Sequence, residues 1–258
     1  MVFIKGENFL ALENRKTTIM KYAIKNFTII IVILLSVQKS IAQEILVIPN
    51  TFFSKRNFEY SVFNGNVSGY INSLGGGITG IYQRFYIDLS GERNFSTNEQ
   101  SIINGLSNTI EFERTDFAAS LGYAVNDSIS TFGGYKYGKS TLTELAFSPL
   151  AGGKTSLEGK GIFIGAGGGW VVKDWGTFSF SAAFAKMVAN YQDLFVGNTK
   201  GKASGTSLGI EWKAPFTNHL SYELSIIRHD YYYEDFSELD SDISEQILSF
   251  RIGLSYRF

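Results

Sequence analysis

Residues 245–258 read EQILSFRIGLSYRF and alternate between apolar and polar side chains along nearly their whole length. Side chains on a β-strand point to opposite faces in turn, so this segment predicts a strand with one apolar and one polar face. One face carries Gln246, Leu248, Phe250, Ile252, Leu254, Tyr256 and Phe258, and the other carries Glu245, Ile247, Ser249, Arg251, Gly253, Ser255 and Arg257.

The same period of two recurs upstream and predicts an all-β chain. Ten strands are expected, with eight as the alternative if residues 56–82 do not form two spanning strands. The three prolines, Pro49, Pro149 and Pro215, lie outside all of these segments, as expected for a residue that cannot donate to a β-ladder. The predicted strands are 56–65, 68–82, 84–94, 109–124, 128–139, 158–172, 176–190, 203–214, 218–233 and 244–258.

The N-terminal region has the pattern of a secretory signal peptide. Residues 27–37 form an unbroken apolar run, with a basic flank before it and a small-residue pattern that ends at Ala42. The run is short for a membrane-spanning helix, although an uncleaved anchor is the alternative. We therefore predict an upstream extension and signal peptide over 1–42, with Met20 as the expected true start, and an exported body over 43–258.

The predicted strands favour a transmembrane barrel over a soluble β-sandwich, which also alternates. Connections alternate between short turns and longer polar segments, as in an antiparallel up-and-down outer-membrane barrel. Backbone groups in lipid must be paired internally, so exported strands that cross a membrane must close into a barrel. Aromatic residues, which favour membrane interfaces, gather beside the short turns: Trp170, Trp175, Trp212, Tyr123 and Tyr222 form the expected girdle.

Composition excludes several classes of function. Lys plus Arg is 23 and Asp plus Glu is 24, and this net charge of −1 argues against a nucleic-acid partner. Cysteine is absent, which excludes disulfides, thiolate metal sites and a cysteine nucleophile. With only two histidines, no metal site and no cofactor are expected.

Three stretches of the chain read GGGITGIYQRFYIDLSG at 75–91, FGGYKYGKS at 132–140 and IGLSYRF at 252–258. Together they resemble the small outer-membrane β-barrel proteins of Gram-negative bacteria, the opacity and outer-membrane-protein-A type. The resemblance implies residence in the outer membrane, among its lipid and lipopolysaccharide, after delivery by periplasmic chaperones. It also implies that the barrel-assembly machinery reads a C-terminal signal, here Leu254, Tyr256 and Phe258.

The polar faces of the strands predict a charged interior. A salt-bridge network that plugs the lumen is the favoured interpretation, because a barrel of this size is largely filled by side chains. A narrow, cation-leaning pore is the alternative, since acids exceed bases. The predicted lumen network consists of Glu59, Asp88, Glu92, Arg114, Asp116, Lys136, Glu211, Glu223 and Arg251.

We expect a non-enzymatic protein that serves envelope structure or surface interaction through long loops near 95–108, 140–157, 191–202 and 234–243. The sequence identifies no surface ligand. Two hydrolase patterns are weaker alternatives. His219-Leu220-Ser221 has the spacing of the lipid A deacylase pair, and the protease type would need His229 and Asp230, which fall on opposite faces of a strand, with Asp240 and Asp242. The run Tyr231–Asp235 is expected at the outer aromatic rim.

Overall fold

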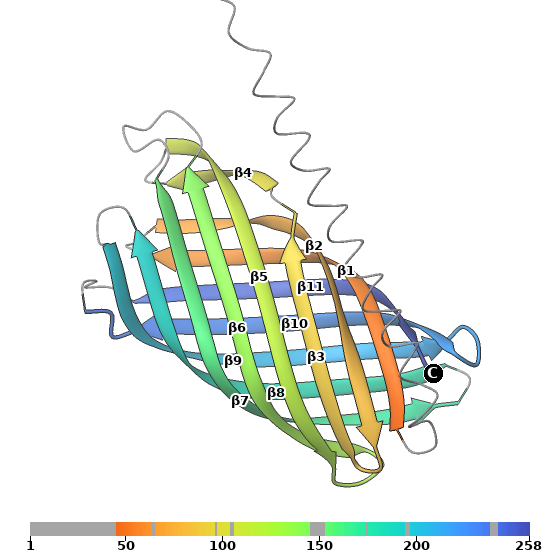
Figure 1. Ribbon diagram of the computed structural model, residues 1–258. Coiled ribbons are helices and arrows are strands. Elements are labelled where there is room, and N and C mark those ends of the chain that lie inside the picture. Colours follow the sequence, from red (N-terminus) through yellow and green to blue (C-terminus); the bar gives the residue numbers. More distant parts are fainter. Residues whose placement is uncertain are drawn as a thin grey trace, which may run out of the picture. The chain divides into compact units, whose positions relative to one another are not determined.

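The structure is a computed structural model, and its described residues form one closed antiparallel β-barrel (Figure 1). The predicted signal peptide and Asp240 lie outside the described residues. No helix within the described part of the chain has the length and apolarity that crossing a bilayer requires. The described residues are 45–62, 65–95, 97–103, 106–144, 153–173, 175–193, 197–237 and 242–258.

The described residues form eleven strands, which make ten positions around the barrel, as the sequence predicts. Strands β3 and β4 both pair with β5, so together they occupy one position, and the β3–β5 pairing closes the cylinder. The eight-strand alternative is wrong, because residues 56–82 belong to two full strands. The strands are β1 (Ile45–Val62), β2 (Gly65–Tyr82), β3 (Phe85–Asn94), β4 (Thr97–Ile103), β5 (Leu106–Ala124), β6 (Ile129–Glu144), β7 (Lys154–Val172), β8 (Gly176–Asp193), β9 (Gly197–Pro215), β10 (Leu220–Glu234) and β11 (Ile243–Tyr256).

One end of the barrel, here named the short-turn end, carries the tight connections 83–84, 125–128, 173–175 and 216–219. Figure 1 marks the C-terminus at this end. The chain reverses sharply at Gln83, with φ of 55°, and at Gly176, with φ of 98°. A positive φ is the conformation that glycine adopts most readily, so Gly176 suits the β7–β8 turn.

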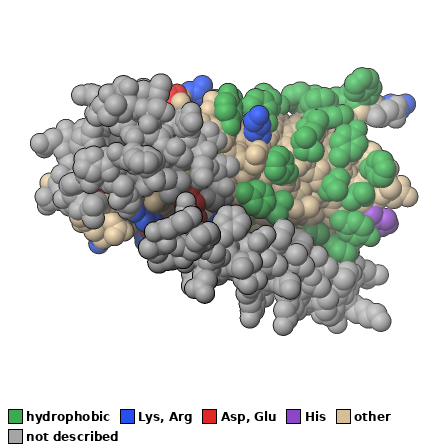
Figure 2. Space-filling model, turned by 90° about the horizontal axis from the view of Figure 1, so that it is seen from above, with side chains coloured by type: hydrophobic (Ala, Val, Ile, Leu, Met, Phe, Trp, Pro, Cys, Tyr) green, Lys and Arg blue, Asp and Glu red, His purple; other side chains and the backbone are tan. Residues whose placement is uncertain are grey.

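An apolar belt surrounds the half of the barrel next to the short-turn end. Figure 2 shows apolar side chains gathered on the wall toward that end. Exposed apolar side chains of this size and number are not stable in water, so lipid is the solvent that fits them. The belt consists of Phe53, Leu74, Tyr82, Phe85, Ile87, Leu89, Phe117, Leu121, Tyr123, Ile129, Tyr135, Ile162, Ile164, Trp170, Phe180, Phe184, Leu208, Ile210, Leu224, Ile226, Phe250, Ile252, Leu254, Tyr256 and Phe258.

Aromatic rings line the edge of the belt at the short-turn end. Trp170 and Trp212 both stack on Phe178, with centroids 6.3 and 6.1 Å away, and Tyr222 meets Trp212 edge-on at 5.2 Å. The Trp212 indole N–H also donates to the Trp175 carbonyl at 2.6 Å. This arrangement places four of the five expected girdle residues at one edge of the belt, and Tyr123 packs on Phe85 of β3.

Beyond the belt, the polarity of the wall reverses. Strands β5, β7 and β9 are 19 residues long, about twice the 9–11 residues that a tilted strand needs to cross hydrocarbon. In this distal half, outward positions such as Lys55, Asn57 and Glu59 are polar, while Phe58 and Tyr60 are buried inside. The distal half is therefore built like a water-soluble domain.

This reversal corrects two expectations. The first strand begins at Ile45 rather than residue 56, and its apolar residues near Phe58 face inward, opposite to the predicted register. Strands also continue through much of the predicted loops, including 97–103 and 197–202. If the outward residues of every strand are expected to be apolar, a strand segment with polar outward residues looks like a loop. The predicted strands therefore end too early.

Candidate functional site

The barrel interior holds a chain of alternating charges at mid-height. Arg251 Nη2 donates to Glu92 at 2.6 Å, and the other oxygen of Glu92 lies 3.3 Å from Arg56 Nε. Arg56 Nη2 reaches Asp116 at 2.8 Å, and Asp116 accepts from Arg114 at 2.9 Å. Arg114 also forms an ion pair with Glu245. The chain starts and ends on β11 and crosses β1, β3 and β5 between.

Neutral side chains complete this network, here named the ion chain. Glu245 accepts from the Ser140 hydroxyl at 2.6 Å and from the Tyr233 hydroxyl at 2.9 Å. Lys136 binds the Tyr231 hydroxyl, and its ammonium lies 4.7 Å from that ring centroid. Buried charges are tolerated when they are paired, and each arginine of the ion chain has a carboxylate partner, although Arg56 Nη1 and Arg251 Nε have no hydrogen-bond partner among the described residues.

An apolar cluster fills the interior on the distal side of the ion chain. Phe58 and Phe112 stack with ring centroids 4.0 Å apart at its centre. The side chains of the cluster are nearly all inaccessible to solvent, as in the core of a soluble protein. The cluster consists of Phe58, Tyr60, Val67, Ile71, Phe112, Leu142, Leu157, Ala185, Met187, Ala189, Tyr191, Ala203, Tyr231, Tyr233, Phe236, Ile243 and Ile247.

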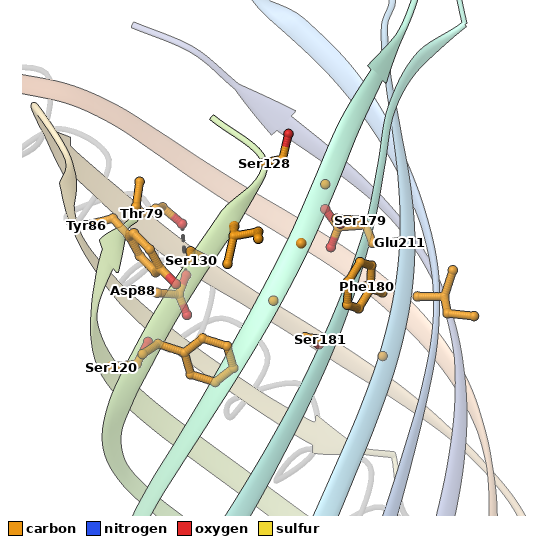
Figure 3. Close-up of a pocket in the computed structure, with 18 of the residues that line it drawn as sticks. Thr79, Tyr86, Asp88, Ser120, Ser128, Ser130, Ser179, Phe180, Ser181 and Glu211 are labelled. Carbon is orange, nitrogen blue, oxygen red and sulfur yellow. Dashed lines mark hydrogen bonds between the residues drawn. The ribbon is translucent and has the colours of Figure 1, made fainter. Parts of the chain in front are cut away.

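A cavity of about 640 Å³ occupies the interior on the short-turn side (Figure 3). Asp88, held by the Thr79 hydroxyl at 2.8 Å, faces it from one wall, and Glu211 faces it from the other. Serine and glycine residues line much of the remainder. The cavity extends to the turn at 125–128, so it belongs to the short-turn end of the barrel.

Phe132 and Phe163 line the same cavity and contact each other edge-on, with centroids 6.2 Å apart. Gly165 faces Phe132 so closely that an added Cβ would lie 2.5 Å from its ring. Gly165 thus makes room for an aromatic side chain inside the barrel.

The structure separates the nine predicted lumen residues into two groups and excludes one. Glu92, Arg114, Asp116 and Arg251 belong to the ion chain, with Lys136 beside it, whereas Asp88, Glu211 and Glu223 lie on the short-turn side. Glu223 accepts from Lys213 at 2.6 Å. Glu59 is a correction: it is exposed on the outer wall, because β1 has the opposite register to the one expected.

Sequence reasoning missed two members of the ion chain. The expected facing of β1 turns Arg56 outward, and the alternation of β11 puts Glu245 on the polar face but identifies no partner for it. Its partner Arg114 lies 131 residues away in sequence. The burial of each side chain, 1% exposed for Arg56 and 2% for Glu245, shows their importance only once the barrel is closed.

The histidines of the two hydrolase patterns lie in different surroundings. His219 sits exposed at the short-turn end, where its ring stacks on Tyr256 and bonds the Arg257 carbonyl at 2.9 Å. His229 faces inward and lies 2.6 Å from the Ser207 hydroxyl, beside a cavity of about 140 Å³ that the ion chain also lines.

Asp230 points outward, where Arg228 binds it at 2.9 Å, so it shares no face with His229. Tyr231 and Tyr233 are buried inside, which corrects the expected outer aromatic rim at this run. Among the described residues, no group of three or more His, Cys, Asp or Glu is arranged to hold a metal ion.

No protein-family model and no curated protein sequence matches this chain. Among solved structures, the outer-membrane protease OmpT from Escherichia coli is similar, with a TM-score of 0.55 at 11% identity over 84% of this chain and 98% of that one. The translocator domain of the autotransporter NalP from Neisseria meningitidis gives a TM-score of 0.52 at 11% identity over 94% of this chain and 98% of that one. This chain has the fold of an outer-membrane β-barrel. At this identity the likeness concerns the fold and not the activity.

Proposed function

We propose that this protein resides in the bacterial outer membrane as a non-enzymatic barrel that does not conduct solutes and that serves envelope structure or surface interaction at its distal end. The observation that carries the proposal is the filled interior, in which the ion chain and the apolar cluster lie in series. The apolar belt, the fold and the N-terminal export pattern support the location.

The distal half supports a role at the cell surface. In outer-membrane barrels the short turns face the periplasm and the opposite end faces outward, so the distal half extends beyond the outer leaflet. A half-barrel with a polar wall and its own apolar core is a rigid platform. Rigid platforms that carry connecting segments are a common arrangement for binding partners.

The surroundings of His229 argue against hydrolysis. Its nearest hydroxyl belongs to Ser207, and the adjoining cavity of about 140 Å³ is too small for a lipid or a peptide segment. Asp116, the nearby acid of the ion chain, is already bound by Arg56 and Arg114. The Ser207–His229 contact is therefore best explained as a satisfied interior hydrogen bond.

A narrow channel is the second candidate, and the short-turn cavity favours it. That cavity carries carboxylates and would suit cations. To conduct, the protein would have to move both the ion chain and the apolar cluster.

Recording from planar bilayers tests the proposal, with a general porin inserted in the same bilayers as the control for insertion. We expect no conductance steps at any voltage from protein that shows heat-modifiable migration on a gel. Reproducible steps from the folded protein would favour the channel instead, and extraction of the protein from membranes by carbonate would refute the location.

A further inference from the structure

Basic residues form a row on the outer wall at the distal edge of the apolar belt. Moving away from the short-turn end, the first charged outward residue is basic on each of five consecutive strands, β6 to β10. These residues are Lys139, Lys160, Lys186, Lys202 and Arg228. The whole chain has a net charge of −1, so the row does not result from an excess of basic residues but from where the basic residues lie on these strands.

Three of these lysines surround one exposed apolar residue. Val188 on β8 pairs with Lys160 on β7 and with Lys202 on β9, and Lys186 is the preceding outward residue on β8 itself. Neighbouring strands lie about 4.8 Å apart, so the backbones of Lys160 and Lys202 are about 10 Å apart. Long lysine side chains at that spacing can direct their ammonium groups to one anion. We name Lys160, Lys186 and Lys202 the lysine patch.

The patch is only partly neutralised by the protein. The cross-strand partners of Lys186 are Ile162 and Ser204, and no carboxylate of the described residues lies within 4.0 Å of it. Lys160 contacts the half-buried Glu158 at 3.1 Å and Lys202 contacts the exposed Asp235 at 2.7 Å, and both lysine side chains are themselves exposed. Exposed pairs contribute little and exchange readily for a stronger anion.

The wall below the patch fits hydrocarbon. Ile162 and Phe184 are the next outward residues toward the short-turn end on β7 and β8, and they are 66% and 43% exposed. A ligand with phosphate at the patch and acyl chains against these side chains would satisfy both surfaces. Phosphates linked to a membrane lipid lie at this depth, immediately outside the hydrocarbon.

We propose that the lysine patch binds the phosphate groups of a phosphorylated glycolipid in the outer leaflet, with the acyl chains of that lipid lying on Ile162 and Phe184. The proposal rests on the outer-membrane location proposed above. It assigns a specific lipid site to one side of the barrel, since the wall at β11 presents no outward charged residue.

Native mass spectrometry of the folded full chain in a neutral detergent tests this site, with bisphosphorylated lipid A and its dephosphorylated form as the probes. We expect the phosphorylated lipid to bind at least about tenfold more tightly. The triple variant K160Q/K186Q/K202Q should lose at least about tenfold in affinity for it, because each lysine contributes favourably to anionic lipid binding.

Lys55→Gln is the matched control, because Lys55 follows Phe53 outward on β1 as Lys186 follows Phe184 on β8. This variant should bind as the unchanged protein does. Equal binding of the two lipids, or equal loss in K55Q and the triple variant, would overturn the proposal. Full competition by millimolar inorganic phosphate would also overturn it, since that would indicate a site for free anions. If the unchanged chain fails to form a heat-modifiable barrel in detergent, the proposed location fails first, and the two failures are thereby distinguished.

Discussion

Replacement of Arg114 by methionine tests whether the ion chain is held together by mutual compensation of its charges. Arg114 is 3% exposed and binds Asp116, Glu245 and the hydroxyl of Ser140. After its removal, Asp116 still has Arg56 at 2.8 Å, whereas Glu245 keeps only neutral donors. Breaking a buried pair by removing one partner costs about 3–5 kcal/mol, so we expect R114M to lower the free energy of unfolding by that amount.

The double variant R114M/E245Q gives the decisive comparison. Glu245→Gln alone should cost about 1.5–3 kcal/mol, the value of a hydrogen bond to a charged group, because Arg114 would retain Asp116. In the double variant no uncompensated carboxylate remains at position 245. We therefore expect it to be more stable than R114M by about 1–2 kcal/mol, although it carries one more substitution.

Denaturant titration of the barrel in lipid vesicles, followed by tryptophan fluorescence and by heat-modifiable migration, measures these differences. Arg228→Met is the control, because Arg228 forms an exposed pair with Asp230 and should contribute less than about 1 kcal/mol. If the losses in R114M and E245Q simply add in the double variant, the reasoning from charge compensation is wrong.

Three further predictions concern packing and the belt. Phe112→Ala removes the ring stacked on Phe58 and should cost about 3–5 kcal/mol in the same titration, without producing conductance in planar bilayers. Gly165→Ala should cost about 1–3 kcal/mol, because the new Cβ would lie 2.6 Å from a backbone carbonyl as well as against an aromatic ring; unchanged stability would contradict the close packing. Ile164→Arg, in the lipid-facing belt, should cost about 2–4 kcal/mol, whereas Asn57→Arg in the distal half should change stability by less than about 0.5 kcal/mol; equal effects would refute the belt boundary.

The sequence predicts the barrel where one side of each strand meets lipid. In β11 and β10 the alternation gives the correct inward and outward faces, because hydrocarbon leaves only apolar side chains outside. In β1 the same rule fails near Phe58 and Glu59. In that part of the wall the polar side chains are outside and the apolar side chains are inside. The period of two is the same, but the apolar residues mark the inner face instead of the outer face.

The interior contacts were less accessible to sequence reasoning. The inward positions of Arg114 and Arg251 follow from alternation, but their partners depend on which strands meet across the lumen. The Arg114–Glu245 pair joins β5 and β11, which are not neighbours in the sheet, so only the closed cylinder brings these residues together and no local spacing signals the contact. The Ser207–His229 contact joins residues that are directly opposite on the neighbouring strands β9 and β10, so it depends on the register of that hairpin.

The inverted distal half has a consequence for how the molecule withstands removal from its bilayer. Because the distal half encloses the apolar cluster, we expect its folded structure not to depend on surrounding acyl chains. After removal of the lipid, backbone amides should exchange first in the belt around Ile164 and last near Phe112. Hydrogen–deuterium exchange should therefore show a protected distal half, or cap, and an unprotected belt half. Under the proposed orientation, such a cap would let the outward-facing half of the barrel persist when the surrounding membrane is disturbed.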